Sequence, residues 1–186
     1  MTKYLGIVAV CVTALLLTVG VWAGELKSGP QVGKAVPGPF HPLNCTGENA
    51  GEKFCLFCKN GENPVAMIFA RQPSPALTKL IKKIDEATVK NKDAGMGSFV
   101  VFLSDSEKLE GELKELAKKE KLQQCVLSID NPAGPKGYKV AKDADVTVVL
   151  YTNRTVKANH TFKKGDLKVQ DIDRIVADVS KILPRK

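Results

Sequence analysis

The run Val65-Ala66-Met67-Ile68-Phe69-Ala70 decides the fold, because six consecutive apolar residues predict a strand that is buried on both faces. Cys55-Leu56-Phe57-Cys58 comes shortly before it, and Asn63-Pro64 leads into it. Two thiols three positions apart can close a small disulfide, exchange electrons with a partner dithiol, or hold a soft metal ion. The pair beside the predicted strand is therefore the first candidate for chemistry.

A helix is predicted directly after this strand. Ser74 is typical of an N-cap, and Pro75 fits the first helical position because its missing N–H would have no partner there. Apolar residues then recur at helical spacing and form one face, which comprises Leu77, Leu80, Ile81 and Ile84. The pattern fades near Asn91, so the helix should end there.

Strands and helices continue to alternate along the chain. In order, we expect a strand at 99–103, a helix capped by 104–106, a strand at 125–129, a Pro/Gly loop at 131–137, a helical turn at 138–142, strands at 146–151 and 156–162, and a closing helix with inward residues from 172 to 183. Alternation of this kind predicts an α/β fold with a parallel core, to which the last two strands add antiparallel edges.

The N-terminal part of the chain has a different character. Residues 1–23 carry one charge and a long apolar stretch, so we interpret them as a secretory signal cut after Ala23; a retained membrane anchor is the alternative. Residues 24–40 form an extended lead-in that is rich in glycine and proline, and residues 41–186 form the domain. Short strands at 43–46 and 54–57 predict a hairpin at the start of that domain.

The net charge of +8 favours solubility over nucleic-acid binding. The lysines are scattered over predicted helix faces, whereas a nucleic-acid reader concentrates them in a patch with interleaved aromatic residues. We therefore expect no nucleic-acid partner, and no membrane association once the signal is cleaved.

Export also bears on the cysteines, because disulfides persist outside the cytosol. Four cysteines follow the signal, namely Cys45, Cys55, Cys58 and Cys125, and all four are disulfide candidates. Cys45 could face Cys55 across the predicted hairpin, and Cys125 could bridge to Cys58 or Cys45. Cys45 and Cys125 could equally be buried thiols, since free cysteine packs as a small apolar residue.

Metal binding is an alternative use of the same residues. His41, Cys45, Cys55 and Cys58 form a set that could hold zinc or copper(I). Haem attachment is not indicated, because Lys59 stands where a histidine is required, and we expect no cofactor. His160 lies on a predicted edge strand, far in sequence from every cysteine, and should be exposed.

Several short motifs, in this order, resemble the thioredoxin-like superfamily, closest to its peroxiredoxin and thiol-disulfide reductase branches. They are Val32-Gly33-Lys34 followed by Pro37 and Phe40, the strand 65–70, Ser104-Asp105, and Tyr138-Lys139-Val140. The resemblance covers roughly residues 32–183. It implies a central mixed sheet flanked by helices, with the N-terminal hairpin as an extension.

The chain departs from that family at the positions that carry its chemistry. The family places its cysteines after the first core strand, where this chain has Arg71-Gln72-Pro73-Ser74-Pro75. It also tends to place a cis-proline before the first hairpin strand, where this chain has Asp145-Val146-Thr147. No catalytic residue is therefore carried over from the resemblance.

The leading hypothesis is an exported protein, periplasmic or extracellular, that exchanges disulfides with a protein dithiol or disulfide partner through Cys55 and Cys58. The first alternative is a non-enzymatic binding or structural domain stapled by disulfides. The second is a metal-handling module. An uncleaved signal would leave the protein anchored to a membrane, and the sequence does not indicate an oligomeric state.

Overall fold

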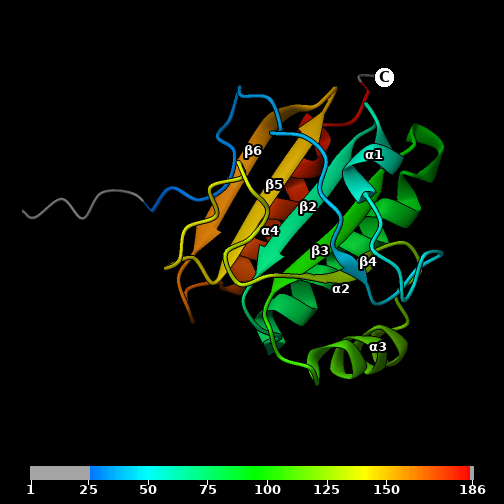
Figure 1. Cartoon of the computed structure of the whole chain (residues 1–186). Coiled ribbons are helices and arrows are strands. Elements are labelled where there is room, and N and C mark those ends of the chain that lie inside the picture. Colours follow the sequence, from blue (N-terminus) through cyan, green and yellow to red (C-terminus); the bar gives the residue numbers. More distant parts are fainter. Residues whose placement is uncertain (1–25, 185–186) are drawn as a thin grey trace, which may run out of the picture.

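A mixed sheet of six strands forms the centre of the protein. The computed structural model describes residues 26–184, and its strands follow the order β1-β4-β3-β2-β5-β6 (Figure 1). Their bounds are β1 Leu43–Asn44, β2 Val65–Ala70, β3 Gly97–Leu103, β4 Val126–Asp130, β5 Val146–Thr152 and β6 Thr155–Phe162. Strands β2, β3 and β4 are parallel, whereas β1, β5 and β6 are antiparallel to their neighbours. The predicted parallel core with antiparallel edges is confirmed.

Within the described residues, three of the four α-helices cover one face of this sheet. The helices are α1 Leu56–Asn60, α2 Pro75–Lys90, α3 Leu109–Glu120 and α4 Val169–Asp178, with short 3-10 helices at Lys92–Ala94 and Val179–Lys181. The crossovers β2-α2-β3 and β3-α3-β4 step the same way across the sheet, so right-handed connections place α2 and α3 on the same face. Helix α4 joins them there, and α1 lies on the opposite face (Figure 1).

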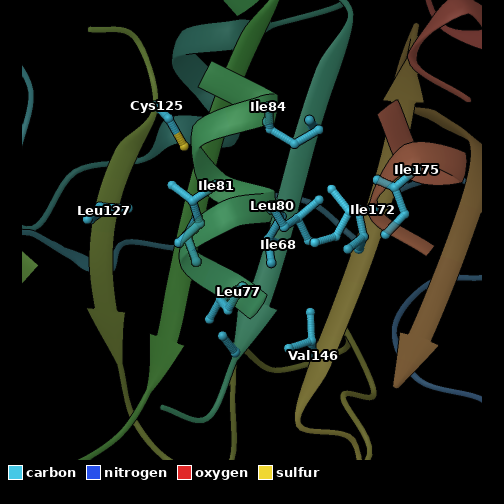
Figure 2. Packing of buried hydrophobic residues seen from close by; sticks show 14 of the residues in the cluster. Ile68, Leu77, Leu80, Ile81, Ile84, Cys125, Leu127, Val146, Ile172 and Ile175 are labelled. Atoms are coloured by element: carbon cyan, nitrogen blue, oxygen red, sulfur yellow. The ribbon is translucent and has the colours of Figure 1, made fainter. Parts of the chain in front are cut away.

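Aliphatic side chains fill the space between the sheet and these helices (Figure 2). Ile68 of β2 points toward Leu80 of α2, and Ile172 of α4 approaches the same region from the side. Ser74 caps α2 as predicted, since its Oγ accepts the N–H of Leu77 at 3.2 Å. The predicted cap of the next helix is wrong: α3 begins at Leu109, after Lys108, with no side-chain cap.

The opposite face is covered mainly by segments without regular structure. Val36 and Phe40 of the lead-in, α1, and the loop that holds Tyr138 pack on it. Tyr138 lies edge-on to Phe40 and to Phe69 of β2, with ring centroids 4.9 and 5.6 Å away, and its hydroxyl donates to the Gly38 carbonyl at 2.6 Å. The helical turn predicted at 138–142 is wrong, because this stretch is an irregular loop.

The N-terminal hairpin exists in a shorter form than predicted. Asn44 donates its N–H to the Glu52 carbonyl at 2.9 Å, and Leu43 forms an isolated antiparallel bridge with Lys53. The second arm stops there because α1 begins at Leu56. The first arm instead becomes β1, which pairs with β4 at the edge of the sheet.

A buried carboxylate fixes the turn between α3 and β4. Asp85 of α2 accepts the backbone N–H groups of Gln123, Gln124 and Cys125 at 3.1, 2.7 and 2.7 Å. These contacts satisfy donors that the turn leaves without partners. Asp85 therefore sets where β4 begins.

The predicted signal at 1–23 lies outside the described residues, so the structure does not address it. Within residues 26–184, no helix is both long enough and apolar enough to cross a membrane.

Candidate functional site

Cys55 and Cys58 form a disulfide at the start of α1. Cys55 is the N-cap residue with an extended backbone, and Cys58 lies in the first turn, so their Cα atoms are 5.2 Å apart. The segment immediately precedes β2, which places the disulfide at the amino end of that strand (Figure 1). The two cysteines that the sequence singles out are thus joined to each other.

The two sulfurs lie in different environments. Cys55 is only 5% exposed and belongs to the core on the α1 face of the sheet, whereas Cys58 is exposed to solvent. The backbone N–H of Cys58 donates to the Cys55 sulfur at 3.1 Å. A hydrogen bond of this kind favours the charged form of its acceptor. Cys58 is therefore the accessible sulfur, and Cys55 has a donor ready to stabilise a thiolate.

Helix α1 is short and is anchored from both ends. Leu56 and Phe57 are buried in the core on the α1 face, and Asn60 donates from its side chain to the Leu56 carbonyl at 2.7 Å. Gly97 leaves room for Asn60, because a Cβ at that position would lie 1.9 Å from its Oδ1. Gly61 ends the helix with a positive φ of 56°. These contacts hold the disulfide in a defined place on the sheet.

Cys45 and Cys125 are free thiols on the opposite face of the sheet. Of the possibilities that the sequence left open, the structure shows the buried thiols, and neither a Cys45–Cys55 bond nor a bridge from Cys125 to Cys58 or Cys45 is formed. Burial raises the pKa of Cys45 to about 11, with a further contribution from Glu110. Burial likewise raises the pKa of Cys125 to about 12, against a hydrogen bond with Ser98 that lowers it. Both thiols are neutral at physiological pH, so the structure favours their role as buried apolar residues.

The proposed metal-binding set is not assembled. Cys45 lies in the core under α2 and α3, Cys55 lies in the core beneath α1, and His41 is exposed. In the described part of the chain, no three histidine, cysteine or acidic residues are grouped so that they could hold a metal ion. These residues do not form one site because the fold places Cys45 and Cys55 on opposite faces of the sheet.

No protein-family model matches the sequence, and no curated protein matches it either. Solved structures do resemble the chain. A candidate protein disulfide isomerase from Bacteroides thetaiotaomicron has a TM-score of 0.64 at 15% identity, covering 85% of this chain and 94% of that one. Peroxidoxin BcpB from Mycobacterium tuberculosis has a TM-score of 0.56 at 14% identity, covering 86% and 100%. A secreted disulfide oxidoreductase of M. tuberculosis, homologous to DsbE of E. coli, has a TM-score of 0.53 at 11% identity, covering 76% and 94%.

The fold is thioredoxin-like. Sequence identities at this level show the fold alone, and function has to be argued from the site. The structure confirms the resemblance that the order of motifs indicated.

Within this thioredoxin-like fold, the carboxyl end of β2 holds an arginine in place of redox residues. The Arg71 guanidinium donates to the carbonyls of Ala141 at 2.9 Å and Ala144 at 3.3 Å, and also to the carbonyl of Pro132. All three acceptors belong to the segment that joins β4 to β5. Arg71 thus fastens this loop over the end of the sheet where the family places its cysteines. No cis peptide bond occurs among residues 26–184.

Sequence reasoning missed Arg71, because its acceptors lie 61 to 73 residues away. The one available signal was a charged residue that directly ends an apolar strand. The prediction for His160 is also wrong: its side chain is 12% exposed and faces Asp178 of α4, with Nε2 and Oδ2 3.1 Å apart. Desolvation lowers the pKa of His160, although Asp178 opposes this shift.

Proposed function

We propose that the protein exchanges disulfides with thiol-bearing partners through Cys55 and Cys58. The observation that carries this proposal is the asymmetry of the pair: Cys58 is exposed, while the buried Cys55 sulfur accepts a backbone N–H at 3.1 Å. An exchange site needs one sulfur that a partner can reach and a second that can leave or attack within the protein.

The asymmetry supports a different role for each sulfur. In the reduced protein, the Cys58 thiolate attacks a partner disulfide and forms a mixed disulfide, and the first partner sulfur leaves as a thiolate. The Cys55 thiolate then attacks the Cys58 sulfur and closes the Cys55–Cys58 bond, so the second partner sulfur leaves as a thiolate. The partner gains two electrons and the protein loses two. The reverse sequence oxidises a partner dithiol.

Export is part of the proposal. The apolar segment within 1–23 and the small residue Ala23 support a cleaved signal, and an oxidising compartment would keep the Cys55–Cys58 bond intact. On this proposal the partners are protein dithiols or disulfides outside the cytosol, in a periplasm or an extracellular space.

A stapled, non-enzymatic scaffold is the second candidate. One observation favours it: Arg71 occupies the end of β2 where the fold usually carries cysteines, and it has a structural task there. In that case the Cys55–Cys58 bond would serve only to fix the first turn of α1, whose Leu56 and Phe57 pack against the sheet.

The reduction potential of the disulfide separates the two candidates. The purified protein is equilibrated in graded glutathione buffers, quenched by alkylation, and its cysteine peptides are weighed by mass spectrometry. Exchange predicts a midpoint near the poise of an oxidising compartment, roughly −180 to −210 mV, whereas a staple predicts a value below about −300 mV. Cys58→Ser should abolish turnover of a model disulfide, and Cys55→Ser should trap the mixed disulfide on Cys58.

Unfolding of the Cys58→Ser variant at temperatures where the wild type is folded would instead support the staple. A matched control is Cys125→Ser, which removes a thiol on the opposite face and should leave turnover intact.

A further inference from the structure

The turn between β5 and β6 has an unusual residue at its centre. Asn153 and Arg154 both adopt left-handed backbone conformations, with φ of 48° and 56°. A two-residue hairpin turn of this type favours Asn at its first position and Gly at its second. A residue other than glycine is strained in such a conformation and persists where surrounding structure or function requires it.

Backbone contacts hold this turn from two sides. Asn153 donates its N–H to the Glu62 carbonyl at 2.8 Å, directly after α1, and Val36 donates its N–H to the Arg154 carbonyl at 2.8 Å. The turn is therefore tied both to the lead-in and to the segment that carries the disulfide.

The Arg154 side chain lies over the helix that holds the disulfide. Its guanidinium carbon is 5.5 Å from the centre of the Phe57 ring, and Phe57 is the neighbour of Cys58 in α1. A cation–π contact of this kind holds the guanidinium near the ring and leaves its N–H groups free to bind. Among residues 26–184, no carboxylate or carbonyl accepts a hydrogen bond from this guanidinium.

Lys59, the cation within α1, is already in an ion pair. Lys59 donates to Glu48 with Nζ and Oε2 2.8 Å apart, and this contact lowers the pKa of Glu48. Arg154 therefore lies beside α1 with donors free for a ligand, and the left-handed turn holds it there. Lys53, which is exposed two residues before Cys55, is a second cation without an ion pair in the described part of the chain.

We propose that Arg154 selects partners that carry a carboxylate close to the reacting sulfur. This inference rests on the proposed exchange at Cys58 and names its substrate class: an anionic thiol or disulfide, such as glutathione or a cysteine flanked by acidic residues. A guanidinium binds a carboxylate through two parallel N–H bonds, and its charge attracts the thiolate that attacks.

The reaction to be measured is reduction of the Cys55–Cys58 bond by a thiol. The incoming thiolate bonds to the Cys58 sulfur, the Cys55–Cys58 bond breaks, and its electron pair goes to Cys55. A second thiolate attacks the thiol sulfur bound to Cys58 and releases Cys58 as a thiolate. The protein gains two electrons, and two thiols become one disulfide.

The test compares three small thiols on the purified, oxidised protein: glutathione, which is anionic, 2-mercaptoethanol, which is neutral, and cysteamine, which is cationic. Arg154→Gly suits the left-handed position and removes the charge, and Arg154→Lys keeps the charge. The control is Lys157→Gln, which removes an exposed charge from the same hairpin. For each protein, the rate of reduction by glutathione is divided by the rate of reduction by 2-mercaptoethanol. Comparing this ratio between variants cancels the intrinsic reactivity of the two thiols.

We expect Arg154→Gly to lower the glutathione ratio by about threefold, which is the effect of one exposed charge pair. The same variant should raise the rate with cysteamine relative to the rate with 2-mercaptoethanol. Arg154→Lys should lie between Arg154→Gly and the wild type, and about 1 M salt should erase the wild-type preference. A ratio that is unchanged in Arg154→Gly, or equally lowered in Lys157→Gln, would overturn the proposal.

The same data separate this inference from the proposed function. If no thiol reduces the native disulfide, exchange itself fails and Arg154 has no substrate to select. If all three thiols react but the ratio ignores Arg154, exchange stands and only the selection fails. Short peptides with Asp or Lys beside cysteine show whether the preference extends from small thiols to protein segments.

Discussion

Strand β2 has a helix at each end, and the two ends hold different halves of what a redox site requires. At the amino end, the five-residue helix α1 carries the disulfide, with a single backbone N–H directed at the Cys55 sulfur. At the carboxyl end, the sixteen-residue helix α2 has a capped N-terminus but no cysteine. There Arg71 holds the β4–β5 loop over the end of the sheet through its hydrogen bond to the Ala141 carbonyl. The N-terminus of a helix lowers the pKa of a thiol that is placed there.

On the proposed function, the capped N-terminus of the long helix and the reacting cysteines lie at opposite ends of one strand. The carboxyl end keeps the architecture that activates a thiol and uses it for stability, while the amino end has the thiols and less means of activating them. Four experiments test this contrast, starting with the largest effect.

The first experiment compares the alkylation rate of Cys58 with the rates of the two buried cysteines on the opposite face of the sheet. After mild reduction, Cys58 should be alkylated at least about 100-fold faster at pH 8 than Cys45 and Cys125, whose pKa values are raised to about 11 and 12. Peptide mass after timed quenching gives the three rates. Comparable rates at all three cysteines would mean that the buried face opens.

The second removes the arginine at the carboxyl end. Arg71→Met should destabilise the fold by about 2 to 3 kcal/mol, because the carbonyls of Ala141 and Ala144 lose their donor, and Tm should fall by roughly 8 °C. Calorimetry measures the loss. The potential of the Cys55–Cys58 bond should not move, and a shift would show that the two ends are coupled.

The third places a thiol where the fold can activate it. In Ser74→Cys, the new sulfur caps α2 in place of an oxygen that accepts the Leu77 N–H, so its pKa should fall about one unit or more below that of a free cysteine. The pH dependence of alkylation gives the value, with the Cys55–Cys58 bond kept oxidised. An ordinary pKa would contradict the assignment of activating power to this end.

The fourth and smallest effect appears in stability at high pH. Cys125 has an ordinary pKa near 9.0 when unfolded and about 12 when folded, so it stays protonated in the native state while the unfolded chain ionises. The stability that this pKa difference gives the folded state is complete below pH 9 and is lost as the pH rises further. From pH 9 to 10 the wild type should lose about 1 kcal/mol more than Cys125→Ala. Urea unfolding gives the free energy of unfolding at each pH. Only its change with pH is compared between the two proteins, so the constant cost of the cavity left by the substitution cancels.

The sequence predicted those parts of the fold that depend on local periodicity. The apolar run of β2 and the spacing of Leu77, Leu80 and Ile84 each report burial within one element, so their assignments are correct. The stretch 138–142 was predicted as a helical turn but is an irregular loop. Its Tyr138 is buried because the ring packs on Phe40, a distant contact that the local sequence does not reveal.

The candidate site was predictable only in part. Spacing made Cys55 and Cys58 one possible pair among several, and their unequal exposure depends on how α1 sits against the sheet. Cys45 and Cys55 were placed together because the sequence does not reveal that the chain crosses from one face to the other between them. Arg154 gave no signal, since its stacking partner Phe57 is 97 positions earlier.

The lead-in has a consequence for the order of events as the chain is made. The buried Ser28 hydroxyl, near the start of the described chain, accepts the Ala141 N–H at 2.9 Å and lies 2.7 Å from the Thr147 hydroxyl, partners 113 and 119 residues later. Asn159 fastens the same segment through the Ser28 and Pro30 carbonyls. The lead-in is synthesised long before these partners, so it must wait without them until residues 141 to 159 have emerged. Contacts this distant slow folding and leave the apolar face beneath the lead-in uncovered until the final steps.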